Sequence, residues 1–253
     1  MKNFFKRIIQ FYLKLLTKFT LWRHKPLIVA IAGTADKTFV KNQILKQVGE
    51  DKKKIRGNPR SFNTEIGLPL AVLYLPSGYS SIFKWVDILM SGTTISFFSR
   101  QFPKILVLEL GVDRRGDMKY LLSLVRPKIA VVTQIDKSFN QNKTTPEDIT
   151  EEFKVLARNL PQDGTLIING DDPRVMKIEK ETKAKVIVYG TKEFCQAQIS
   201  QIREGAEGIE FKLSYNDKIT MERIGQFGKN KEHSFTAAKV TAQEIKYLKD
   251  QEM

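Results

Sequence analysis

The segment Gly33-Thr34-Ala35-Asp36-Lys37-Thr38 has the residue types of a phosphate-binding loop. It follows an apolar run at Leu27–Ala32 and precedes a helical pattern at Thr38–Val48. In a strand–loop–helix arrangement, backbone N–H groups and the helix N-terminus converge on phosphate oxygens. In such a loop the lysine, Lys37, neutralises the β- and γ-phosphates, and the hydroxyl of Thr38 binds Mg²⁺. The order of these residues therefore predicts a nucleotide site, with ATP and Mg²⁺ as cofactors.

Asp36 departs from the usual pattern, which has glycine immediately before the lysine. Aspartate tolerates a left-handed backbone better than most residues, so the loop conformation remains accessible. Its carboxylate would nevertheless lie near the phosphates, where like charges ~4 Å apart cost on the order of 1–4 kcal/mol. Asp36 is therefore compatible with the loop and unfavourable for ATP.

Short apolar runs alternate with helical patterns along most of the chain, which predicts an α/β fold with a mostly parallel sheet and helices on both faces. From about Ile199 the segments become shorter and alternate, with a turn at Asn216-Asp217, which predicts an added antiparallel hairpin. The predicted strands are Leu27–Ala32, Ile105–Leu110, Ile129–Ile135, Thr165–Asn169, Lys185–Tyr189 and Ile209–Tyr215. The predicted helices are Thr38–Val48, Met118–Val125, Pro146–Asn159, Pro173–Thr182 and Glu232–Gln251.

Composition narrows the class of protein. The 253 residues are 42% hydrophobic and 28% charged, so a sizeable core can form. The single cysteine, Cys195, excludes an internal disulfide framework, and with two histidines it leaves little material for a zinc site. The net charge of +14 favours anionic partners, namely nucleotides, nucleic acid, acidic lipids or acidic metabolites.

Half of that net charge lies in residues 1–25, which contain seven Lys or Arg and no acid. The longest uncharged run of this segment lies between Arg7 and Lys14. A transmembrane helix needs about 20 mostly apolar residues, so this segment does not span a membrane. Two alternatives remain: a basic amphipathic helix on an anionic membrane, or a helix packed on the domain formed by residues 26–253. The apolar residues at helical spacing are Phe5, Ile8, Ile9, Tyr12, Leu15, Leu16, Phe19 and Trp22.

Several ordered motifs besides the loop resemble the central ATP-binding domain of the Mur ligase family, most closely the branch that adds a D-alanyl-D-alanine dipeptide. The resemblance covers roughly residues 26–242. The motifs are Asn63-Thr64-Glu65-Ile66-Gly67-Leu68-Pro69, Glu109-Leu110-Gly111, Gly116-Asp117, Arg126-Pro127, Thr133-Gln134-Ile135 and Asn169-Gly170-Asp171-Asp172-Pro173.

The resemblance implies that ATP phosphorylates a carboxylate and that an amine then displaces the phosphate to form an amide, as in peptidoglycan precursor synthesis. By position, residues 33–38 would bind the triphosphate, with Asn169 and Asp171 also on the nucleotide. Glu109, at the carboxyl end of a strand, would bind Mg²⁺ with Thr38; the alternative is pairing with a nearby Lys or Arg. Asn63 and Thr64 match a segment near the substrate, and turn formation or helix capping is the alternative for them. Asn169 and Asp171 also fit a plain turn.

The departures from the family imply weakened catalysis. Phe139 stands where the family has a metal-binding histidine, and Phe153 where it has a carbamylated lysine, although a shift of one residue would bring in Lys154. Ser234 replaces the adenine-contacting asparagine, and His233 lies beside it. These three departures, together with Asp36, favour an inactive scaffold, whereas the retained Gly33, Lys37, Thr38 and Glu109 favour an ATP-binding ligase domain.

Family members also carry a UDP-sugar domain before the loop and a closing domain after residue 253. We therefore expect that this chain alone does not run the ligation, and that a partner chain supplies the missing domain or that the gene is split or decaying. The alternative is a scaffold or regulator docked to membrane or ligase through residues 1–25. No recognition motif supports nucleic-acid binding. The expected location is the cytoplasm, including the inner face of the membrane.

Overall fold

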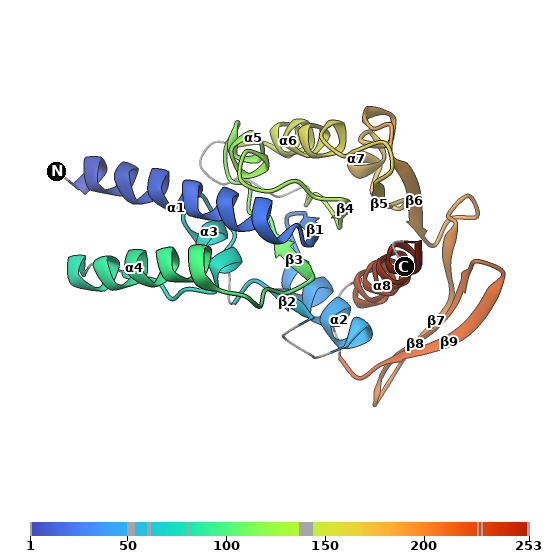
Figure 1. Cartoon of the computed structure of the whole chain (residues 1–253). Coiled ribbons are helices and arrows are strands. Elements are labelled where there is room, and N and C mark those ends of the chain that lie inside the picture. The colour runs from blue at the N-terminus through green and yellow to red at the C-terminus, as the bar shows by residue number, and fades with distance from the viewer. Residues whose placement is uncertain are drawn as a thin grey trace.

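The computed structural model describes residues 2–49, 54–59, 62–79, 81–136, 144–226, 228 and 230–251. Within these residues the strands form one nine-stranded sheet in the order β2-β3-β1-β4-β5-β6-β7-β8-β9 (Figure 1). The pairs from β2 to β7 are parallel, and β8 and β9 are antiparallel to their neighbours. This confirms the predicted α/β class. The strands are β1 (Leu27–Ala32), β2 (Ile55–Gly57), β3 (Ile105–Glu109), β4 (Ile129–Val132), β5 (Thr165–Asn169), β6 (Lys185–Gly190), β7 (Ala197–Gly205), β8 (Gly208–Tyr215) and β9 (Lys218–Ile224).

Helices cover both faces of the sheet because alternate strand residues point to opposite sides. Val29 and Ile31 of β1 pack with α2 (Lys37–Val48) and α8 (Lys231–Gln251). Ala30 and Ala32 face the other cluster, in which the sheet packs against four helical segments. Those segments are α3 (Gly67–Leu73), α5 (Asp117–Leu122), α6 (Pro146–Arg158) and α7 (Pro173–Met176).

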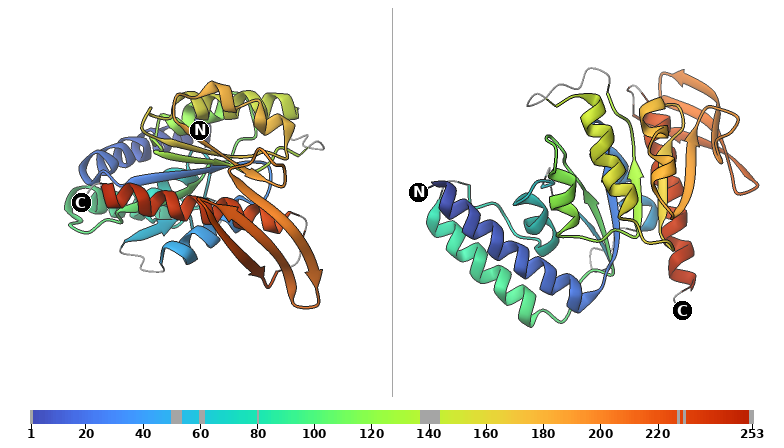
Figure 2. Two further views of the ribbon diagram at one scale, coloured as in Figure 1. Left: turned by 90° about the vertical axis from the view of Figure 1, so that its right-hand side faces the viewer. Right: turned by 90° about the horizontal axis from the view of Figure 1, so that it is seen from above.

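A pair of long helices extends beyond this layered domain. The helices α1 (Lys2–His24) and α4 (Ile82–Phe98) run side by side, and a third core cluster joins them to α3 (Figures 1 and 2). Helix α4 has no clear amphipathic signal in the sequence and was not predicted, because its polar positions are mostly Ser and Thr rather than charged residues. Three of those hydroxyls donate to the carbonyl four residues earlier: Thr93 to Leu89, Thr94 to Met90 and Ser96 to Gly92.

Several predicted elements differ in extent from the observed ones, and the predicted helix at 118–125 is observed as α5, which ends at Leu122. The strand predicted to reach Ile135 ends at Val132, since the Gln134 carbonyl accepts the N–H of Thr34 instead of extending the ladder. The predicted helix at 173–182 divides into α7 and a 3₁₀ turn at Glu179–Glu181. The predicted hairpin is one part of the antiparallel strands β7, β8 and β9.

Candidate functional site

The predicted phosphate loop lies at the point where the strand order reverses. In the sheet order β2-β3-β1-β4, the connection after β1 leads through α2 to β2 on one side, and the connection after β3 leads to β4 on the other side. Open α/β sheets place their ligands in the crevice at such a switch point. The loop at residues 33–36 connects β1 to α2 at this position.

Gly33 is required by the close approach of β4. Its φ of 144° lies outside the range that side chains readily adopt, and a Cβ there would be 2.0 Å from the hydroxyl oxygen of Thr133. That hydroxyl donates a 2.8 Å hydrogen bond to the carbonyl of Ala35. The backbone N–H of Thr34 donates to the carbonyl of Gln134 at 2.9 Å. The loop is therefore held against the end of β4 from both sides.

Asp36 adopts the left-handed conformation, with φ 61° and ψ 4°, and precedes the first residue of α2. Its carboxylate lies 2.6 Å from the ammonium group of Lys231, at the start of α8. The same ammonium lies 4.8 Å from the centre of the Phe39 ring in α2. The negative charge that counted against ATP is thus paired with a cation from the far end of the chain.

Lys37 closes the loop by donating a 2.6 Å hydrogen bond to the carbonyl of Gly33. Burial lowers the pKa of Lys37, and the nearby carboxylates of Glu109, Asp113 and Asp36 oppose that shift only in part. The N-terminus of α2 receives no side-chain cap from Asp36. Its first N–H groups and the Lys37 ammonium therefore offer donors at one place, as an anion site requires.

Thr38 and Glu109 come together as predicted for a metal site. The Thr38 hydroxyl donates to Oε2 of Glu109 at 3.0 Å, although 71 residues separate them. The alternative role for Glu109 is also present, because Nζ of Lys41 lies 2.7 Å from Oε1 and both side chains are almost fully buried. Asn58 completes the cluster through two hydrogen bonds. Its side-chain Oδ1 accepts the backbone N–H of Glu109 at 2.7 Å, and its backbone carbonyl accepts a 2.9 Å bond from the Lys41 ammonium.

Sequence reasoning missed Lys41 and Asn58. The one available signal was spacing, since Lys41 follows Lys37 by one helical turn and so points to the same side of α2. No comparable signal existed for Asn58, which reaches Glu109 only through the pairing of β2 with β3.

The Thr38 and Glu109 oxygens fit the preferences of Mg²⁺, which binds hard oxygen donors and usually uses one or two carboxylates with phosphate oxygens and water. Among the described residues there is no cluster of three or more His, Cys, Asp or Glu that could hold a metal ion alone. Oε1 of Glu109 accepts no hydrogen bond from the described residues and has only its ion pair with Lys41. A cation here would therefore take most of its ligands from a bound nucleotide and solvent.

A second group of predicted residues lines an open cavity of about 800 Å³ beside the loop. Gln134 connects the two regions, because it accepts the Thr34 N–H and also a 3.1 Å hydrogen bond from Asn230. The cavity is bounded by the ends of β4 and β5, the loop after β6 and the start of α8. Its lining residues include Gln134, Asn169, Asp171, Thr191, Asn230 and His233.

His233 is held in this cavity between two carboxylates. Its Nε2 lies 2.6 Å from Asp171, and its Nδ1 lies 3.0 Å from Glu232. Burial lowers the pKa of His233, but the hydrogen bonds with Glu232 and Asp171 outweigh burial and raise it overall. For Asp171, burial acts to raise the pKa, but the hydrogen bonds with His233 and Thr191 outweigh burial, so the pKa of Asp171 is lowered overall. Asp171 is therefore tied into a buried charged network as well as into a turn, in which its N–H donates to Asn169.

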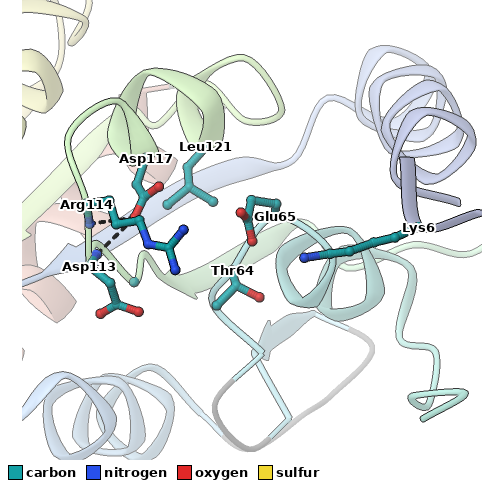
Figure 3. A pocket seen from close by; sticks show the side chains of 8 residues that line it. Lys6, Thr64, Glu65, Asp113, Arg114, Asp117 and Leu121 are labelled. Carbon is teal, nitrogen blue, oxygen red and sulfur yellow. Dashed lines mark hydrogen bonds between the residues drawn. The ribbon is translucent and has the colours of Figure 1, made fainter. Parts of the chain in front are cut away.

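Of the two predicted substrate-side residues, Thr64 lines a separate pocket of about 210 Å³ (Figure 3). Thr64 and Glu65 lie across it from Arg114, and Lys6 approaches from α1. Thr64 also accepts the N–H of Gly67 at the start of α3, which is the capping role given as its alternative. Asn63 does not line this pocket but packs on Gly111, where an added Cβ would be 2.7 Å from the Asn63 side chain.

Comparison with known proteins identifies the family. A family model described as the Mur ligase middle domain matches residues 88–241, more than half of the chain. The chain belongs to the Mur ligase family.

Its Mur ligase relatives are longer than this chain. The UDP-N-acetylmuramoyl-tripeptide–D-alanyl-D-alanine ligase of Bacillus subtilis is 28% identical over 188 residues, which is 74% of this chain and 35% of the relative. A UDP-N-acetylmuramate–L-alanine ligase from Syntrophus aciditrophicus is 28% identical over 105 residues, 40% of this chain and 22% of the relative. The chain therefore spans about a third of the first of these relatives.

Solved Mur ligase structures share the fold at low sequence identity. MurF from Acinetobacter baumannii has a TM-score of 0.74 at 16% identity and covers 93% of this chain and 47% of its own. MurF from Thermotoga maritima, solved in complex with ADP, has a TM-score of 0.72 at 18% identity and covers 94% of this chain and 49% of its own.

The structure shows the surroundings of two residues that depart from the Mur ligase pattern, Phe153 and Ser234. Phe153 is 1% exposed in the core beneath α6, so no metal ligand of this chain occupies that position. Lys154 does not replace it, because its ammonium pairs with Glu151 and Glu181. Ser234 is buried and is not among the described residues that line the cavity. Phe139 lies outside the described residues.

Proposed function

We propose that this Mur ligase domain binds a nucleoside triphosphate with Mg²⁺ at the loop between β1 and α2. The observation that carries the proposal is the contact between Thr38 and Glu109, which brings a hydroxyl and a carboxylate to 3.0 Å beside Lys37 at the switch point of the sheet. The structural likeness to a MurF that was solved in complex with ADP supports nucleotide binding by this fold.

Each residue has a definite part in this proposal. The N-terminus of α2 and the Lys37 ammonium would bind the phosphate oxygens, and burial of Lys37 makes that charge more effective than one in water. Thr38 and Glu109 would hold Mg²⁺, which neutralises charge on the phosphates when bound. Lys41 and Asn58 would keep the Glu109 carboxylate in place. The cavity around Asn169 and His233 would take the base and ribose.

The wider activity follows from the family. The relatives named above are, by name, ligases that act on UDP-N-acetylmuramate or UDP-N-acetylmuramoyl-tripeptide. We extend to this chain the coarser role of supplying the nucleotide-binding part of an amide ligation. Since the chain spans about half of the MurF structures it matches, we propose that a further domain, on this or a partner chain, completes the site.

Calorimetry with MgATP tests the proposal directly. The native protein should bind MgATP with release of heat, and Lys37→Ala should abolish the signal. Lys46→Ala is the matched control, because Lys46 is exposed in the last turn of the same helix and should leave the affinity unchanged. If the folded native protein shows no heat of binding at millimolar MgATP, the proposal is wrong.

One observation favours a second candidate function, an inactive scaffold. Phe153 fills the core at the position where the family resemblance implies a metal-binding lysine. A protein that binds MgATP but never releases phosphate, alone or with a ligase partner, would be a nucleotide-binding scaffold. Phosphate release on addition of a partner would exclude this second candidate.

A further inference from the structure

The outer surface of α1 carries an apolar stripe that the fold does not cover. Ile8, Phe11, Leu15 and Trp22 are spaced by three, four and seven residues, so they lie along one side of the helix. Their exposed fractions are between 47% and 69%. The residues that pack on α3 and α4, including Ile9, Leu13 and Leu16, form a different, buried side. Helix α1 thus has two apolar sides: one is buried against α3 and α4, and the other is exposed.

Helix α4 carries a matching stripe with the same spacing. Phe83, Val86, Met90 and Phe97 follow one another by three, four and seven residues. Their exposed fractions lie between 49% and 85%. The buried side of α4, which includes Trp85, Ile88 and Gly92, faces the third core cluster and Leu16 of α1.

The two stripes form one surface because they flank the same helix–helix contact. The Phe19 ring stacks on Phe97 at 4.6 Å and also contacts Trp22 at 5.9 Å, which joins the stripes at one end. Midway along, the Tyr12 hydroxyl bonds that of Thr93 at 2.7 Å. The helices run side by side and away from the sheet, so the surface is elongated and open (Figure 2).

The charge around this surface is almost entirely positive. Helix α1 contains no acid, and Asp87 is the one acid of α4. Arg7 and Lys18 are exposed along the edge of the α1 stripe, and Lys84 is exposed on α4. A folded protein partner would need a large acidic and apolar patch to match this surface. An anionic bilayer supplies both features over a flat area.

We propose that the outer surface of α1 and α4, defined by their two apolar stripes and the cations beside them, docks on an anionic lipid bilayer. The apolar side chains enter the boundary between headgroups and acyl chains, and the cations contact the lipid phosphates. Both contributions are needed for stable peripheral binding. No helix in the described part of the chain is long and apolar enough to cross the bilayer, so the helices lie along its surface. This inference does not depend on the nucleotide site.

Vesicle flotation of the full chain tests the proposal. The protein should float with vesicles of phosphatidylcholine mixed with phosphatidylglycerol and remain behind with phosphatidylcholine alone. The Phe11→Gln/Phe83→Gln variant should bind at least ~10-fold more weakly, because each change removes an exposed aromatic ring from the bilayer. Arg7→Gln/Lys18→Gln should lose about 5-fold per cation, a loss that added salt reproduces in the native protein.

The matched control is Ile219→Gln/Met221→Gln, which removes two equally exposed apolar side chains from β9 and should leave vesicle binding unchanged. Trp22 gives an independent signal, since it is 69% exposed and the other tryptophan, Trp85, is buried. Anionic vesicles should shield Trp22 from a soluble quencher. Equal binding of the native and Phe11→Gln/Phe83→Gln proteins would overturn the proposal. So would dimerisation through this surface without vesicle binding, which would make the occupant a second copy.

Discussion

The carboxylate of Asp36 and the ammonium of Lys231 lie 2.6 Å apart, although 195 residues separate them in the sequence. Each side chain is about four-fifths buried. The pair joins the first residue of α8 to the residue that precedes α2, and so holds both helices at the edge of the phosphate loop. The charge of an aspartate in a phosphate-binding loop is therefore masked within the chain.

This relationship predicts a selective defect. Lys231→Met should weaken MgATP binding on the order of 10-fold, because the Asp36 charge then faces the phosphates without its partner. Adding Asp36→Asn to that variant should restore the affinity, as measured by calorimetry. If the double variant binds as weakly as Lys231→Met alone, Lys231 contacts the nucleotide itself, and the masking role is wrong.

The buried pair of Lys41 and Glu109 predicts a stability effect. Lys41→Met should lower the free energy of unfolding by about 3 kcal/mol, since it leaves the Glu109 carboxylate buried and unpaired. The Lys41→Met/Glu109→Gln variant should regain much of that loss. Urea unfolding of both variants provides the measurement. A loss below about 1 kcal/mol for Lys41→Met would show that water replaces the lysine.

We expect the Lys37 charge to lower the stability of the folded protein while it favours nucleotide binding. Burial holds its pKa below the usual value, so the folded state binds fewer protons than the unfolded state between the two pKa values, and charged Lys37 opposes folding at lower pH. Lys37→Met should therefore raise the melting temperature of the nucleotide-free protein at neutral pH, and this gain should shrink as the pH rises through the lowered pKa. The same variant should not bind MgATP. Lys46→Met, on the exposed side of α2, should change neither property.

For His233 we expect a contribution to stability that is largest at low pH, whereas the Lys37 charge opposes folding there. Its pKa is raised in the folded protein, so its interactions with Asp171 and Glu232 stabilise most below pH ~6.5 and are lost as the pH rises through the raised pKa. The native protein should exceed His233→Gln in unfolding free energy at pH ~6, and the gap should narrow in alkaline solution. Below neutral pH, protonation of Asp171 and Glu232, whose pKa values are lowered, removes the effect only under strongly acidic conditions. A gap that grows with pH would contradict the assignment.

Much of the fold was predictable because its signals are local. The apolar runs of β1, β3, β4, β5 and β6 are continuous, as expected of strands buried on both faces, and all five were predicted. The phosphate loop was predictable for the same reason, since Gly33, Lys37 and Thr38 lie within six residues of one another. The missed elements lack a clear pattern: β2 has three residues, too few of them apolar, and the polar positions of the long helix α4 are mostly Ser and Thr.

The candidate site was predictable only in part. Thr38 and Glu109 were predicted as partners from the family resemblance, and the structure places them in contact. Lys41 and Asn58 were not predicted, because their roles depend on the pairing of β2 with β3 and on the packing of α2 over that edge. The sequence places the negative charge of Asp36 in the loop, but only the tertiary structure brings the Lys231 ammonium beside that charge.

The sequence by itself determined the alternation of buried strands with helices, the position of the phosphate loop and the concentration of positive charge in residues 1–25. Each of these depends on residue types within a few positions of one another. Tertiary structure decided which charges are paired and which apolar sides remain open. Helical periodicity shows that α1 is apolar on a wide arc, but only the packing of α3 and α4 divides that arc into a covered side and an exposed one. Coverage depends on neighbours that are distant in the sequence, so no local pattern can specify it.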